Sequence, residues 1–143
     1  MKILYTAVVT ATGARHGRVE SSDGHLNLLL APPPEMGGNG GATNPEQLFA
    51  GGYAACFGGA MEYLARQSKI NLGDVQIAAK VGIGPNDAGN GFGLAVELDI
   101  SALALSQPDA EKLVRDAHQV CPYSNATRGN IEVRLIANGK PLL

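Results

Sequence analysis

The sequence predicts an α+β fold in one domain that covers residues 1–143. Two segments, residues 3–30 and 75–101, consist of short β-branched or alternating runs separated by turn residues, which is typical of strands. Two others, residues 44–66 and 107–121, carry apolar side chains at helical spacing behind helix-start signals. The length matches one ordinary domain with a substantial core and leaves no room for a second.

Composition places the chain among globular proteins without a strongly charged surface. Hydrophobic residues make up 45%, charged residues 17%, and the formal net charge is -2. Without a basic surface we expect no nucleic-acid partner, and without a run of about 18 apolar residues we expect no membrane span. The apolar run in residues 1–14 is too short and too rich in β-branched residues for a signal peptide. The sequence therefore predicts a cytoplasmic protein.

The N-terminal part is expected to form a β-meander followed by an irregular loop. Strands are predicted at residues 3–12 and 18–22, joined by the turn 13–17, with a third strand near 25–30. Residues 31–43 contain three prolines and four glycines, so regular structure is not expected there. We expect a mobile flap beside the helix that follows.

The long helix predicted at residues 44–66 is the central element of the chain. Asn44 suits the N-cap and Pro45 the first helical position. A core-facing stripe about 100° wide is formed by Phe49, Tyr53, Cys56, Phe57, Ala60 and Leu64. Four glycines inside the helix cost roughly 1 kcal/mol each relative to alanine. We therefore expect a neighbouring backbone or a ligand to approach this helix closely.

The C-terminal part is expected to contain a hairpin, a second helix and a final strand. The predicted elements are strands at 75–83 and 92–101 around the loop 84–91, a helix at 107–121, a capped turn at 121–130 and a strand at 131–137. Pro122 is expected to end or redirect the second helix.

The two cysteines, Cys56 and Cys121, are open to several interpretations. Cys56 could be a small buried hydrophobe, but Cys121 stands at a helix end where a thiol can be accessible and could resolve an oxidised partner. In the cytoplasm such a pair is expected to be redox-active rather than a permanent crosslink. His118 with Cys121 is half a zinc site at most, so no metal is expected, and no spacing identifies the histidine base of a cysteine hydrolase.

Two charged residues become candidate catalytic residues if one of the cysteines is peroxidatic. Arg15 in its turn and Glu46 in the first turn of the helix are ordinarily solvated charges. A peroxidatic cysteine would make use of both, because an arginine fork can stabilise a thiolate and orient a peroxide while a carboxylate holds the arginine.

Three stretches resemble the organic hydroperoxide resistance protein family, a branch of the OsmC-like superfamily. They are NPEQLFAGGYAACFGGA around Cys56, HQVCPYSNATRGNIEVRL around Cys121 and TGARHGRVESSDG around Arg15, and the likeness spans nearly the whole chain. The resemblance implies a thiol peroxidase in which Cys56 attacks the hydroperoxide, Cys121 resolves the sulfenic acid, and Arg15 and Glu46 are the catalytic arginine and glutamate. One departure is Gly13-Ala14-Arg15-His16-Gly17, where the family pattern has a glycine and an aspartate beside the arginine.

The same resemblance implies an architecture and partners. It predicts an OsmC-like fold with antiparallel sheets wrapped around two central helices, assembled as an intertwined homodimer with active sites at the interface. It implies no bound cofactor, and an external dithiol of the lipoamide type, such as a lipoylated protein, as reductant.

An apolar approach to the thiol would favour an organic substrate. We expect Phe49, Tyr53, Phe57 and Met61 to line it, with Met36 and residues 32–34 as a cover, so that alkyl and fatty-acid hydroperoxides gain burial that hydrogen peroxide cannot. One alternative is an OsmC-type general peroxidase with substantial hydrogen peroxide activity. Another is a thiol redox switch without turnover, for which the sequence offers no DNA-binding helix pair or basic stripe.

The spacing of Glu46 and Cys56 raises the question of which subunit supplies each group. Ten residues along one helix separate their backbones by roughly 15 Å, and their directions differ by about 80°. The helix could bend at its glycines, Arg15 could bridge the gap, or Glu46 could come from the other subunit. The small-residue faces favour close helix packing, so we expect a composite site at a subunit interface.

Overall fold

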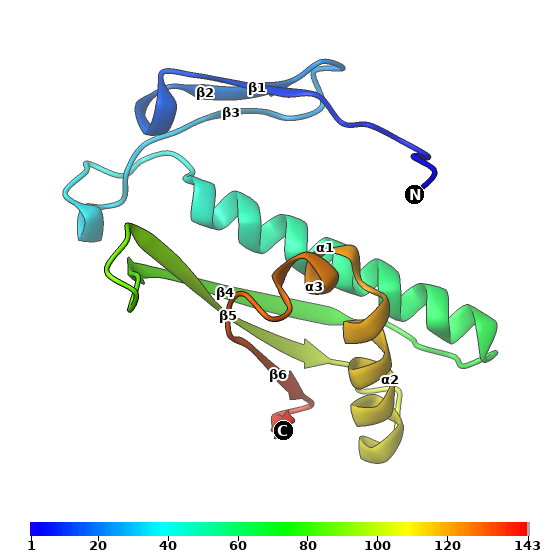
Figure 1. Cartoon of the computed structure of the whole chain (residues 1–143). Coiled ribbons are helices and arrows are strands. Elements are labelled where there is room, and N and C mark those ends of the chain that lie inside the picture. The colour runs from blue at the N-terminus through cyan, green and yellow to red at the C-terminus, as the bar shows by residue number, and fades with distance from the viewer. Residues whose placement is uncertain (143) are drawn as a thin grey trace. The chain divides into compact units, whose positions relative to one another are not determined.

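The computed structural model describes residues 1–142. These fall into two compact units, Met1–Leu48 and the residues from Phe49 onward, which are described separately below. In chain order the elements are β1 (Val9–Thr12), η1 (Ala14–His16), β2 (Arg18–Ser21), β3 (Asn27–Leu29), η2 (Pro34–Met36), α1 (Pro45–Gln67), β4 (Gln76–Pro85), β5 (Phe92–Ser101), α2 (Gln107–Val120), α3 (Pro122–Thr127), β6 (Val133–Ala137) and β7 (Lys140–Leu142) (Figure 1). The α+β class is confirmed, whereas the expectation of a single domain stays a prediction.

The first unit contains a three-stranded antiparallel sheet in the order β1-β2-β3. The predicted meander is therefore confirmed, although the first strand begins at Val9 and residues 3–8 lie outside it. Its first turn is the short 3-10 helix η1, which carries Arg15. The turn requires a glycine at position 17, because a Cβ there would lie 1.7 Å from the Thr12 carbonyl oxygen.

The loop before α1 is more regular than predicted. Residues 34–36 form the 3-10 helix η2, which Pro34 can begin because it needs no backbone N–H there. Leu30 and Thr43 form an isolated parallel bridge that ties the two ends of the loop together. The expectation of no regular structure in 31–43 was wrong at these points.

Helix α1 begins where the sequence predicts. The Asn44 side chain accepts a hydrogen bond from the Gln47 backbone N–H at 2.9 Å, and Pro45 occupies the first position. The helix runs without interruption to Gln67 despite its internal glycines.

The second unit is built on a four-stranded sheet in the order β4-β5-β6-β7. Strands β4 and β5 pair antiparallel over their full length, from Gln76 opposite Ser101 to Pro85 opposite Phe92. Strand β6 returns parallel to β5 after the chain has passed through α2 and α3, so the sheet is not wholly antiparallel as expected. The last strand, β7, was not predicted.

The core of the second unit lies between α1, α2 and the sheet. Tyr53, Phe57 and Met61 on α1 are fully buried, and they pack in one cluster with residues of β5 and α2. The members on these last two elements are Val96, Leu98, Ile100, Ala110, Leu113, Val114 and Ala117. The predicted core-facing stripe of α1 is thereby confirmed.

The segment after α2 is a helix rather than the expected turn. Cys121 is at once the C-cap of α2 and the N-cap of α3, with an extended backbone at φ -60 and ψ 124. A proline favours an extended conformation in the residue before it and suits the first position of a helix. Pro122 therefore ends α2 at Cys121 and starts α3 in a new direction, which leaves a corner at Cys121. Cys121 is fully buried at this corner.

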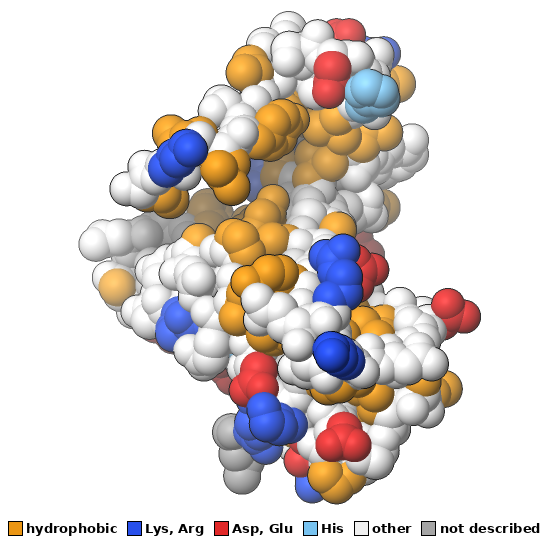
Figure 2. All heavy atoms as spheres, turned by 90° about the vertical axis from the view of Figure 1, so that its right-hand side faces the viewer, with side chains coloured by type: hydrophobic (Ala, Val, Ile, Leu, Met, Phe, Trp, Pro, Cys, Tyr) orange, Lys and Arg blue, Asp and Glu red, His pale blue; other side chains and the backbone are white. Residues whose placement is uncertain are grey.

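Two surface properties accompany this fold. Among the described residues no helix combines the length and apolarity needed to cross a bilayer. Acidic and basic side chains are interspersed on the face drawn in Figure 2, in keeping with the small net charge.

Candidate active site

The fold of the second unit brings the two cysteines together. Cys56 lies on α1 and Cys121 at the corner between α2 and α3, and their Sγ atoms are 3.6 Å apart. Both are free thiols, and Cys121 is buried whereas Cys56 is partly exposed. Because a disulfide needs a separation of about 2.05 Å, a small movement suffices to join them.

The surroundings of Cys56 disfavour its thiolate on balance. Burial raises the pKa of the thiol, and the neighbouring Cys121 raises it further. The backbone N–H of Tyr123 donates to Cys56 and acts in the opposite direction on that pKa. A nucleophilic Cys56 at neutral pH therefore requires a further favourable charge, which is the role predicted for Arg15.

A buried polar network fixes α3 to the helices around it. The Tyr53 hydroxyl on α1 lies 2.9 Å from Ser124 Oγ and 3.2 Å from Thr127 Oγ1. His118 Nδ1 on α2 lies 2.9 Å from the same Ser124 Oγ. Burial, and then the nearby Arg128, lower the pKa of His118, which favours the neutral imidazole in this network. The described residues contain no group of three potential metal ligands.

Arg15 and Glu46 form a two-point ion pair within the first unit. Arg15 Nη1 donates to Glu46 Oε2 at 2.9 Å, and Nη2 donates to Oε1 at 2.8 Å. The hydrogen bond from Arg15 is the main cause that lowers the pKa of Glu46, and the same bond raises the pKa of Arg15. The expected contact between the two side chains is present, and their action on Cys56 stays a prediction.

The residues predicted to line the substrate approach are placed unequally. Tyr53, Phe57 and Met61 are fully buried in the core and offer no surface to a substrate in this conformation. Phe49 is partly buried and packs edge-on against Tyr53. Met36 is exposed on η2 in the first unit. Of the four predicted for the second unit, Phe49 alone presents a partly open side chain.

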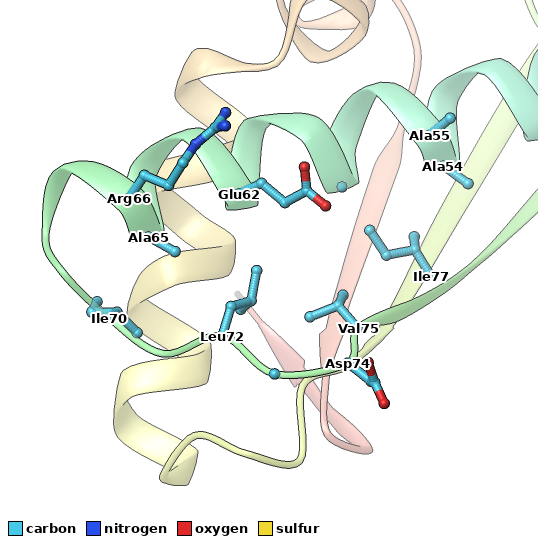
Figure 3. A pocket seen from close by; sticks show the side chains of 12 residues that line it. Ala54, Ala55, Glu62, Ala65, Arg66, Ile70, Leu72, Asp74, Val75 and Ile77 are labelled. Atoms are coloured by element: carbon cyan, nitrogen blue, oxygen red, sulfur yellow. The ribbon is translucent and has the colours of Figure 1, made fainter.

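Two hollows of the second unit lie away from the thiol pair. One, of about 650 Å³, lies beside α1, where Glu62 and Arg66 line it together with Leu72 and Val75 (Figure 3). The other, of about 800 Å³, lies at the loop end of the β4–β5 hairpin. Neither thiol lines either of them, although Phe49 lines the second.

Tyr123 at the thiol site and Ser124 in the neighbouring polar network were not predicted. Tyr123 supplies the amide to Cys56, and its ring packs on Phe49 and Tyr53 with centroids 6.1 and 5.6 Å away. Ser124 joins the polar network. Their sequence neighbourhood predicted only a turn, and no spacing signal places either residue against α1.

Comparison with known proteins gives a consistent result. The model of the family called OsmC-like protein matches residues 38–136. An organic hydroperoxide resistance protein of Xanthomonas axonopodis pv. citri is 57% identical over 136 residues, which are 94% of each chain.

Two solved structures are similar over most of this chain. One, from Vibrio cholerae O1 biovar eltor, is of an organic hydroperoxide resistance protein with captopril bound in one of the active sites. It superposes with a TM-score of 0.94 at 51% identity and covers 99% of this chain and 97% of its own. The other, OhrB of Bacillus subtilis, has a TM-score of 0.85 and 43% identity and covers 94% of this chain and 98% of its own.

Proposed function

The chain belongs to the OsmC-like family, in its organic hydroperoxide resistance branch, and from this we propose that it is a thiol peroxidase that reduces organic hydroperoxides to alcohols. The observation that carries the proposal is the pair of free thiols 3.6 Å apart, one buried and one partly exposed. The more accessible thiol can meet a substrate, and the buried thiol can meet only its neighbour.

The reaction divides into two steps at these thiols. The Cys56 thiolate attacks the terminal peroxide oxygen, the O–O bond breaks, and the alcohol leaves with a proton, so that Cys56 becomes a sulfenic acid. Cys121 then attacks the Cys56 sulfur, a disulfide forms, and the hydroxyl leaves as water. The enzyme returns to its reduced state when an external dithiol, which we infer to be of the lipoamide type, exchanges with the disulfide.

Arg15 is the group that we infer to favour the Cys56 thiolate and to orient the peroxide. Its guanidinium is held by both oxygens of Glu46, which fixes the plane of the fork. Because burial raises the pKa of Cys56, a nearby guanidinium would supply the positive charge that the thiolate needs.

An organic substrate is favoured over hydrogen peroxide by the apolar neighbours of the thiol. Phe49 and Tyr123, each partly accessible, lie against one another on the face of α1 that carries Cys56. An alkyl chain that covers such rings gains about 25 cal/mol per Å² of apolar surface removed from water, a gain that hydrogen peroxide lacks.

We further infer that the protein acts as a homodimer. The first unit exposes an unusual set of large apolar side chains: Ile3, Leu4, Tyr5, Val8, Val9, Leu28 and Leu29. Exposed apolar surface of this extent on a small protein is typical of an interaction surface. A second copy of the chain is the partner that fits the active sites expected between subunits.

One experiment tests the reaction. The purified protein is assayed with a reduced dithiol, with an alkyl hydroperoxide and hydrogen peroxide in parallel, and intact mass is recorded after one equivalent of peroxide. Faster turnover of the alkyl hydroperoxide supports the proposal, and equal rates point to the general peroxidase. Oxidation of the thiols without turnover points to a redox switch.

Two variants separate the roles of the thiols. Cys56→Ser should abolish the reaction, whereas Cys121→Ser should reduce one equivalent of hydroperoxide and stop as a sulfenic acid that dimedone traps. Oxidation of Cys121 in the Cys56→Ser protein, at the rate of the unmodified chain, would overturn the assignment.

A further inference from the structure

The segment that carries Cys121 lies across one face of α1. Positions 49, 52, 53 and 56 of a helix share a face, since they are three or four residues apart. Tyr123 packs its ring on Phe49 and Tyr53 on that face, and its backbone N–H donates to Cys56 one turn further on. Cys121 Sγ reaches the same Cys56 at 3.6 Å.

Gly52 lies against the hydroxyl end of the Tyr123 ring. A Cβ added to Gly52 would be 2.8 Å from Tyr123 Oη and 3.3 Å from both Cε2 and Cζ. Ordinary carbon contacts begin at about 3.5 Å, so any side chain at position 52 must displace the ring. The Tyr123 ring also packs on the rings of Phe49 and Tyr53, so moving it disturbs both of these contacts.

We propose that Gly52 is a positioning residue for the thiol pair: its missing side chain lets Tyr123 lie against α1, and this contact holds Cys121 within reach of Cys56. The inference rests on the proposed redox role of the two thiols. It accounts for one of the four helix glycines by a close approach. It also assigns a role to the partly exposed Tyr123 ring, whose packing on α1 keeps the Cys121 sulfur close enough to reach the sulfenic acid in the resolving step.

The test substitutes the glycine and compares it with a matched position. Gly59 lies two turns after Gly52 on the same face of α1, and a Cβ added there meets no atom within 4 Å. Gly52→Ala and Gly59→Ala therefore bring the same gain in helix propensity, and only the first displaces Tyr123.

The readout is the rate at which the Cys56–Cys121 disulfide closes. It is followed by intact mass after alkylation, with one equivalent of an alkyl hydroperoxide in one arm and the thiol oxidant diamide in the other. Gly52→Ala should slow closure severalfold to roughly tenfold, because the ring must move by a few tenths of an ångström, less than the 1 Å that can cost about a hundredfold, and it should lengthen the period in which dimedone traps the sulfenic acid. Gly59→Ala should close at the unmodified rate.

A second substitution shows whether the effect passes through the ring. Tyr123→Ala removes the ring and should itself slow closure, and adding Gly52→Ala to it should change nothing more. The inference is overturned if Gly52→Ala closes at the unmodified rate, or if it slows closure by the same factor in the Tyr123→Ala background. Closure with diamide but not with hydroperoxide would remove the proposed function, and the diamide arm would still decide the role of Gly52.

Discussion

The guanidinium of Arg15 and the carboxylate of Glu46 match each other in geometry and in charge. Two nearly equal hydrogen bonds, 2.9 and 2.8 Å long, join the guanidinium to the carboxylate, and the arginine side chain is still 37% exposed. A lysine could keep one charge-assisted bond but could not reproduce the planar fork. The arginine is thus held in a fixed orientation with part of its surface left for another group.

We therefore expect Arg15→Lys to lower kcat/KM for an alkyl hydroperoxide by roughly a hundredfold, the usual cost of losing a preorganised donor. Arg18→Lys is the matched control, because Arg18 is an exposed arginine of the neighbouring strand β2 that pairs with Asn27. Steady-state kinetics of both variants settle the matter. Full activity in Arg15→Lys would mean that Arg15 is only a surface charge.

The lowered pKa of Glu46 makes a pH-dependent contribution to stability. Arg15 favours the ionised carboxylate in the folded protein, so the contribution is complete above the ordinary glutamate pKa of about 4.3 and is lost as pH falls through the lower folded pKa. Urea unfolding of the unmodified protein and of Glu46→Gln is compared between pH 3 and pH 7. The two unfolding midpoints should differ above the ordinary glutamate pKa and should converge as the pH falls through the folded pKa of Glu46. Glu20→Gln, at an exposed residue of the central strand β2, serves as control, and a difference that does not change with pH would contradict the linkage.

At the scale of elements, α3 depends on α1 through a few buried polar atoms. The Tyr53 hydroxyl is within hydrogen-bond distance of both Ser124 and Thr127, and all three side chains are buried. Loss of that hydroxyl leaves buried groups on α3 with one partner fewer, which costs more than an exposed hydrogen bond is worth.

Tyr53→Phe should accordingly lower the free energy of unfolding by about 1–3 kcal/mol. Tyr63→Phe is the matched control on the same helix, because its hydroxyl bonds Gln67 at the surface, and it should change stability by less than about 0.5 kcal/mol. Chemical denaturation of both variants provides the comparison. Equal effects would show that the network does not secure α3.

The elements that the sequence predicted well are those with local signals. The start of α1 follows from Asn44 and Pro45, and the β4–β5 hairpin follows from two alternating runs around a glycine-rich loop. The parallel pairing of β6 with β5, and the strand β7, depend on partners far along the chain, which no local pattern encodes. For α3 the proline was correctly seen as a break, but its ability to start a new helix was missed.

The candidate site shows the same division. The resemblance selected Cys56 and Cys121, but a separation of 65 residues gives no distance between them. Tyr53, Phe57 and Met61 were assigned to a substrate approach because they are large and lie near Cys56 on α1. All three are fully buried, as the core-facing stripe predicts for Tyr53 and Phe57, and their part in a substrate approach stays a prediction.

At the scale of the whole molecule, Glu46 and Cys56 of one chain are too far apart along α1 for their side chains to meet directly. Both lie on α1, which runs without interruption over a rise of roughly 15 Å between them. The dimer that we propose, in which one subunit supplies Cys56 and the other supplies Arg15 and Glu46, would overcome this distance. The exposed apolar side chains of the first unit, among them Leu4 and Leu29, favour association.

Subunit mixing tests this composite site. Cys56→Ser and Glu46→Ala proteins are each expected to be inactive, or nearly so. A heterodimer of the two would contain one site with an intact Cys56 from one chain and an intact Glu46 from the other. After exchange of subunits, verified by native mass, activity should return to about a quarter of the unmodified level, since about half of the dimers are mixed and each has one of two sites.

The control replaces the Cys56→Ser chain by one that carries both substitutions. Mixed with Glu46→Ala, it can form heterodimers equally well but cannot supply an intact Glu46 to any site, so no activity should return. If exchange is verified and the first mixture stays as inactive as the control, Cys56 and Glu46 act within one chain. In that case Arg15 must span the distance along α1, and the dimer would serve stability rather than the chemistry of the site.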